Sequence, residues 1–154
     1  MRTALALFVC LVTSTVSAAV GPVPDIATRT RGAKSIVVAT VVSVNARQGT
    51  NRFGDQLIVS DVLLNVSETL KGSHVQAVTV SVEGGQLGDL TLKVSDLPAM
   101  KVGERAVFFL EQAPEGIVPH QRGFGILKLD AADRVEESML TMAELRRLIQ
   151  AALK

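Results

Sequence analysis

The sequence predicts a mainly β domain, with five or six antiparallel strands wrapped into a barrel and one amphipathic helix at the C-terminus. Three observations support this fold class. Valine dominates the apolar residues while aromatic residues make up only 3% of the chain, which is typical of strands packed through β-branched side chains. Apolar segments of strand length recur between turns marked by glycine and proline. The last apolar segment follows a helical repeat instead.

The first two predicted strands form a long hairpin. Residues 35–46 are apolar or small on both faces, which is typical of a central strand or of one that curves so that both faces are covered. Residues 56–70 form an unusually long second strand, as expected of a bent strand that crosses from one side of a barrel to the other. The glycines within residues 47–55 predict a loop longer than a two-residue turn.

Three shorter predicted strands follow. Residues 77–83 alternate between valine and other residues, which indicates a half-buried third strand. A glycine-rich loop at residues 84–89 leads to a fourth strand at residues 90–95. Residues 106–110 are apolar without alternation, so we expect this fifth strand to be buried on both sides.

The C-terminal part contains the last predicted strand, residues 124–129, and then a helix. Thr141 and Glu144 have the spacing of a capping box, in which each side chain bonds a free backbone N–H at the helix start. The residues that follow place one apolar stripe on a helix that we expect to pack on the barrel. The stripe consists of Leu145, Leu148, Ile149 and Ala152.

The residues before the first strand predict export. Arg2 precedes a mainly apolar stretch, residues 4–16, and small residues then end at Ala18, the pattern of a cleaved signal peptide. This stretch is shorter than the roughly 20 apolar residues that cross a bilayer. We therefore expect an extracytoplasmic protein, periplasmic or secreted, without stable membrane insertion after cleavage. The predicted divisions are a signal peptide (1–18), a leader or linker without apolar periodicity (19–34) and a single domain (35–154).

Charge and cysteine content argue against several classes of function. The chain has a formal net charge of +1, and cleavage after Ala18 would leave equal numbers of basic and acidic residues. A nucleic-acid-binding protein depends on an excess of Lys and Arg, so we expect no nucleic-acid partner. Cys10 is the only cysteine and lies in the predicted signal peptide, so the exported chain would have no thiol for a disulfide, a metal site or catalysis.

The sequence contains few candidates for catalysis. His74 and His120 each stand without an HxH or HExxH partner, although a zinc site needs three or four ligands. No GxSxG elbow or P-loop is present. Glu83 and Glu104 flank glycine turns, where solvated acids are common. We therefore expect no catalytic residue, no metal and no cofactor, and the enzymatic alternative is a small hydrolase that uses His120.

Several motifs give the chain a resemblance to a known family. They are IVVATVVSV in the first strand, ETLKG after the second, VTVSVEGG in the third and VGERAVFFL in the fifth. Together they resemble a family of bacterial exported domains, which are similar in strand order to the OB-like barrel of netrin-like and tissue-metalloproteinase-inhibitor domains. Such domains occur alone or beside extracellular metalloproteases of the matrixin type. The resemblance covers residues 35–129 and implies an OB-like five- to six-stranded antiparallel barrel.

The resemblance does not transfer a mechanism. The inhibitors insert an N-terminal cysteine into the zinc site of the protease, and the exported part of this chain has no cysteine. Protease activity does not transfer either, because no HExxH motif is present.

The leading functional hypothesis is an exported, non-enzymatic binding module, a partner of an extracellular protease or of another envelope protein. The alternatives are the hydrolase that uses His120 and a carrier of a small apolar ligand, since a valine-lined barrel can hold an apolar cavity. We expect a binding face at the loops of one barrel rim, such as residues 47–55 around Phe53.

Overall fold

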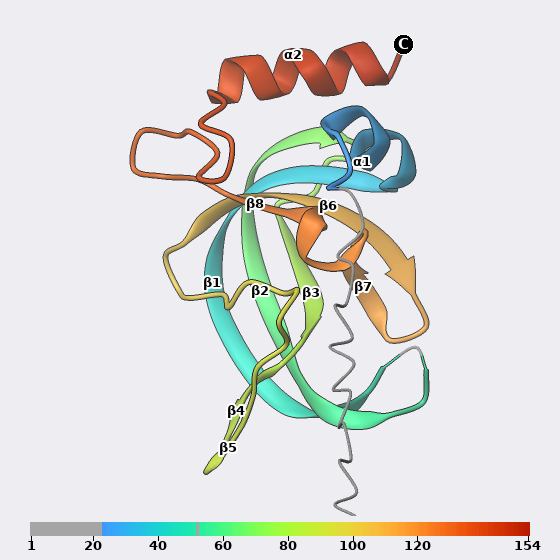
Figure 1. The fold of residues 1–154 in the computed structure, drawn as a ribbon, viewed down its shortest axis with the longest axis vertical. Coiled ribbons are helices and arrows are strands. Elements are labelled where there is room, and N and C mark those ends of the chain that lie inside the picture. Colours follow the sequence, from blue (N-terminus) through green and yellow to red (C-terminus); the bar gives the residue numbers. More distant parts are fainter. Residues whose placement is uncertain (1–22, 52) are drawn as a thin grey trace, which may run out of the picture.

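The computed structural model describes residues 23–51 and 53–154, and the predicted signal peptide lies outside them. The main sheet has six antiparallel strands, and a separate hairpin and three helices complete the fold (Figure 1). The main sheet contains β1 (Ser35–Thr50), β2 (Gln56–Lys71), β3 (Ala77–Glu83), β6 (Arg105–Ala113), β7 (Gly116–Pro119) and β8 (Ile126–Lys128). The other elements are β4 (Gly85–Leu87), β5 (Leu90–Leu92), α1 (Ile26–Gly32), the 3₁₀ helix η1 (Arg122–Gly125) and α2 (Met142–Ala152).

The strands follow the order β3–β2–β1–β6–β7, and β8 pairs with β6. The predicted mainly β fold with antiparallel strands and a C-terminal helix is confirmed. The predicted barrel does not close, because β3 and β7 lie near each other without pairing. We keep the term barrel for this curled, open sheet. We call this gap between β3 and β7 the seam. A strand edge is thus left open on each side of the seam, where side chains rather than a ladder of backbone bonds hold the two ends of the sheet together.

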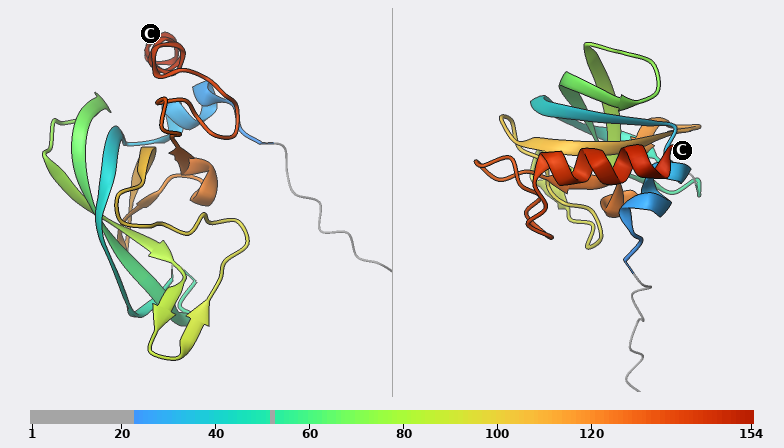
Figure 2. Two further views of the ribbon diagram at one scale, coloured as in Figure 1. Left: turned by 90° about the vertical axis from the view of Figure 1, so that its left-hand side faces the viewer. Right: turned by 90° about the horizontal axis from the view of Figure 1, so that it is seen from above.

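Both faces of the central strands are covered, as the sequence predicts. Alternate residues of β1 and β6 point to opposite faces of the sheet. One face packs against Leu145 and Ile149 of α2, and the other faces the barrel interior. Figure 2 shows α2 lying across one end of the barrel. The helix-facing residues include Ile36, Val38, Val107 and Phe109, and the interior residues include Val37, Ala39, Ala106 and Phe108. This two-sided burial explains why neither strand alternates in sequence.

The predicted capping box at the start of α2 is confirmed. The Thr141 side chain accepts a hydrogen bond from the Glu144 N–H, and the Glu144 carboxylate accepts one from the Thr141 N–H at 2.9 Å. The buried stripe is narrower than predicted, since Leu145 and Ile149 are fully buried while Leu148 is exposed. The described part of the chain contains no helix with the length and apolar character needed to span a bilayer.

The segment assigned to a leader differs from its prediction, because residues 26–32 form α1. Asp25 caps this helix by accepting a hydrogen bond from the Thr28 N–H at 2.7 Å. Arg29 is buried and donates to the carbonyl oxygens of Pro24 and Phe124, each at 2.9 Å. A seven-residue helix is too short to show periodicity, and the acceptors of its buried cation are backbone groups that no sequence pattern reveals.

Lys71 holds the C-terminal end of α1, and its replacement by methionine should loosen the helix. The Lys71 ammonium donates to the carbonyl oxygens of Thr30, at 2.7 Å, and of Ala33. Loss of these charge-assisted bonds should lower the free energy of unfolding by about 1–3 kcal/mol, measured by urea denaturation. Lys34→Met changes an exposed lysine nearby and should have little effect. Equal losses in both variants would contradict this role of Lys71.

The predicted glycine-rich loop contains a strand. β4 pairs with β5 in a hairpin that stands apart from the main sheet, at the end of the barrel opposite α2 (Figure 1). Gly85 has a φ of 133°, and a Cβ atom there would lie 2.3 Å from the Ser60 hydroxyl oxygen. Ser60 in turn donates to the Gly84 carbonyl at 2.7 Å. These close contacts require glycine and fix the hairpin over the open end of the barrel.

Candidate functional site

An apolar hollow lies at the open end of the barrel, between the main sheet and the segment formed by β4, β5 and residues 93–100. We call it the mouth hollow. Its volume of about 440 Å³ falls in the usual range for small-molecule sites. Most of its lining is apolar, and the exposed Lys93 is one of its few charged lining residues. The apolar lining includes Val44, Val62, Val82, Leu92, Leu97 and Met100.

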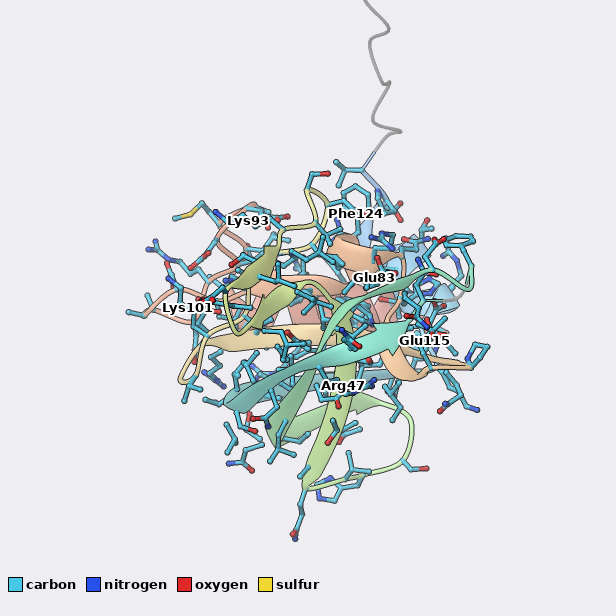
Figure 3. The ribbon with its side chains drawn as sticks, turned by 90° about the horizontal axis from the view of Figure 1, so that it is seen from below. Arg47, Glu83, Lys93, Lys101, Glu115 and Phe124 are labelled. Carbon is cyan, nitrogen blue, oxygen red and sulfur yellow. The ribbon has the colours of Figure 1, made fainter. Side chains whose placement is uncertain are left out.

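A smaller and more polar hollow of about 220 Å³ lies next to it at the seam. We call it the seam hollow. Its lining comes from β1, β2, β3, β7, the turn between β6 and β7, and the start of η1. The two hollows share Val82, Glu83 and Leu97, so Glu83 faces both. In Figure 3, Arg47, Glu83 and Glu115, which all line the seam hollow, lie on the same side of the barrel.

Arg122, Asp96 and Glu83 form an ion triad beside the two hollows. Arg122 donates two hydrogen bonds to Asp96 and one, at 2.9 Å, to Glu83. The guanidinium therefore joins η1 to β3 and to the segment that walls the mouth hollow. Hydrogen bonding to Arg122 holds the pKa of Asp96 below its usual value, and the two carboxylates raise the pKa of Arg122.

Ser81 adds a polar atom with no internal partner. Its side chain is more than nine-tenths buried, and its hydroxyl has no hydrogen-bond partner within the described residues. Ser81 lines the seam hollow two residues before Glu83 on the same face of β3. An unsatisfied buried hydroxyl costs about 1–3 kcal/mol, so a ligand that hydrogen-bonds to it would recover part of that cost.

His120 and Glu111 are arranged like the histidine and the acid of a catalytic triad, without the nucleophile. Its Nδ1 lies 2.7 Å from the Glu111 carboxylate. Its Nε2 is buried and has no hydrogen-bond partner in residues 23–51 and 53–154. That nitrogen faces α1, where a Cβ atom on Gly32 would lie 2.2 Å from it. The position that a nucleophilic hydroxyl would need is therefore occupied by helix backbone.

The remaining sequence candidates divide into those that lie apart from the two hollows and those that line one of them. Phe53 sits at the tip of its loop with 76% of its surface exposed, and its role in binding stays a prediction. Three other residues of the predicted rim, Arg47, Thr50 and Asn51, line the seam hollow. His74 is exposed. Among the described residues, no group of three or more His, Cys, Asp or Glu side chains is placed to hold a metal ion.

Sequence reasoning missed the polar residues of the site. Glu83 was expected to be a solvated acid beside a turn, which is wrong, because its side chain is only 20% exposed and bonded to Arg122. Asp96, Arg122 and Ser81 carried no motif at all. The one available signal was the pair Gly84-Gly85, which requires close backbone approach beside Glu83.

Asp96 should make stability depend on pH. Its pKa is depressed by Arg122, so its contribution is present above its usual value of 3.8 and is lost as the pH falls through the folded-state pKa. Because the side chain is half exposed, this contribution should be at most about 1 kcal/mol. Asp96→Asn should therefore destabilise the protein at pH 7 and approach the wild type at pH 3, measured by urea denaturation.

The control for this pH series is Asp89→Asn, which changes an exposed acid in the β4–β5 turn. It should leave stability unchanged across the range. A difference between Asp96→Asn and wild type that grows toward pH 3 would contradict the ion pair with Arg122.

No protein-family model matches the chain, and no curated protein matches its sequence. The chemistry that the site supports follows from its own residues. They form an apolar hollow of ligand size beside a polar one that contains Ser81, Glu83 and Arg122.

Proposed function

We propose that the protein is an exported, non-enzymatic binding module that takes a small apolar ligand in the mouth hollow. The observation that carries this proposal is an apolar space of about 440 Å³ at the open end of the barrel, next to the packed interior cluster that contains Val62 and Val82. Export is proposed from the signal-peptide pattern of residues 1–18. Of the functions expected from the sequence, the carrier of a small apolar ligand is the one that this space favours.

The size of the hollow sets the expected affinity. Each buried methylene contributes about 0.8 kcal/mol, so about eight of them give at most about 6 kcal/mol, and the tightest Kd expected is in the order of tens of micromolar once the cost of association is considered. A ligand with a chain of about ten carbons therefore suits this space. The hydrolase alternative receives less support, because Nε2 of His120 is enclosed by α1.

Titration with the neutral fluorescent dye N-phenyl-1-naphthylamine tests the proposal. We expect saturable binding to one site in the wild type. Ala99→Trp adds an indole at the lining of the mouth hollow and should weaken dye binding at least tenfold. Ala151→Trp makes the same change on an exposed position of α2, at the other end of the barrel, and should leave binding unchanged.

Two results would overturn the proposed site. One is dye binding that does not saturate, which would indicate nonspecific surface association. The other is an equal affinity in wild type, Ala99→Trp and Ala151→Trp, which would place the dye outside the mouth hollow. Urea denaturation of each variant shows whether a loss of binding reflects a loss of fold.

A further inference from the structure

We infer that the ligand is a cationic amphiphile, whose apolar chain occupies the mouth hollow and whose primary ammonium binds at Glu83. This inference rests on the proposed function and adds the chemical class of the ligand. It comes from the place of Glu83 at the junction of the two hollows, where one group can meet both an apolar chain and a polar head.

The first argument is the charge of the triad. One guanidinium, that of Arg122, is shared between two carboxylates, those of Glu83 and Asp96. Asp96 receives two of the three hydrogen bonds and Glu83 receives one, so the excess negative charge lies toward Glu83. Arg47 across the seam hollow is matched by its own partner, Asp61, through two hydrogen bonds. A cationic head group therefore complements the site.

The second argument is the unpartnered hydroxyl of Ser81. This buried oxygen lies on the same face of β3 as Glu83 and lines the seam hollow. An ammonium has three N–H donors and no acceptor, whereas a carboxylate or phosphate head has acceptors only. Glu83 and Ser81 can both accept from an ammonium. The Ser81 hydroxyl can also donate to an anionic head, but such a head would be repelled by Glu83.

Lys93 is the competing charge, since it also lines the mouth hollow and would favour an anionic head. It is exposed to solvent, and in Figure 3 it lies well away from Glu83. Exposed charges contribute about 0–1 kcal/mol to an ion pair because water and salt screen them. Glu83 is largely shielded, so its charge acts more strongly on a bound head group.

Three probes of equal chain length test the head group: decylamine, 1-decanol and decanoate. Each is used below its micellar concentration to displace the dye from the wild type, from Glu83→Gln and from Lys93→Gln. We expect decylamine to bind at least tenfold more tightly than decanol, with decanoate the weakest. Glu83→Gln should reduce decylamine to the affinity of decanol, because Arg122 keeps Asp96 and the fold is retained. Lys93→Gln should leave the order unchanged.

The outcomes separate this inference from the proposed function. Equal affinity for decylamine and decanol, with no effect of Glu83→Gln, would overturn the ammonium site while the apolar site stands. If decanoate binds most tightly to the wild type and its affinity falls to that of decanol in Lys93→Gln, the ligand is anionic and the inference of a cationic ligand is wrong. If neither the dye nor any of the three probes binds, the proposed small-ligand function is wrong. The mouth hollow would then be expected to accept an apolar side chain of a partner protein.

Discussion

Phe109→Ala is expected to lower the free energy of unfolding by about 3–5 kcal/mol, the usual cost of removing a fully buried phenylalanine. Phe109 has no exposed surface and belongs to the cluster that joins β1, β6 and α2. Alanine would leave a cavity between the sheet and the helix, and neighbours on two rigid elements cannot collapse to fill it. Because domains are stable by only about 5–15 kcal/mol, urea denaturation should show a large shift of the midpoint.

Phe53→Ala is the matched control, since it removes the same side chain from an exposed loop tip. Its free energy of unfolding should stay within about 0.5 kcal/mol of the wild type. Similar losses in the two variants would contradict the packing of α2 on β6. The control variant also tests the rim hypothesis: a loss of dye or decylamine binding in Phe53→Ala would extend the binding face to this loop.

The burial of Phe109 was predictable because two-sided packing leaves a mark in the sequence. Residues 106–110 are apolar without alternation, and this run predicts a strand covered on both faces. The start of α2 was predictable for a similar reason, because the Thr141–Glu144 capping box is a local pattern. The ends of the strands were less predictable. β1 continues to Thr50, beyond its apolar part, because it pairs with β2 there and not because it is buried.

The open seam and the candidate site were not predictable, because they depend on contacts between distant segments. Arg122 meets Asp96 and Glu83 from positions far along the chain, and charged residues beside turns usually face solvent. Whether β3 and β7 pair is decided by how far the sheet curls, which no local pattern encodes. Polar side chains gather at this unpaired edge, so the structure was needed to choose among the functions expected from the sequence and to locate the site.

Gly123→Ala is expected to lower the free energy of unfolding by about 3 kcal/mol or more and to abolish ligand binding. A Cβ atom on Gly123 would lie 1.9 Å from the Asp96 carbonyl oxygen, a backbone atom that cannot rotate away. Either η1 or the segment 93–100 must move. Because that segment walls the mouth hollow and carries Asp96, its displacement would open the apolar site and break the bonds to Arg122. Urea denaturation and dye titration measure the two effects.

Gly103→Ala separates this clash from the general cost of replacing a glycine. Gly103 has a φ of 87° and open space around its Cβ position, so alanine there adds only backbone strain, about 1–2 kcal/mol. It should leave dye binding intact. If Gly123→Ala proves no more destabilising than Gly103→Ala and binds the dye normally, residues 93–100 do not wall the mouth hollow. If Gly123→Ala loses both stability and binding, the close contact between η1 and Asp96 is what shapes the site.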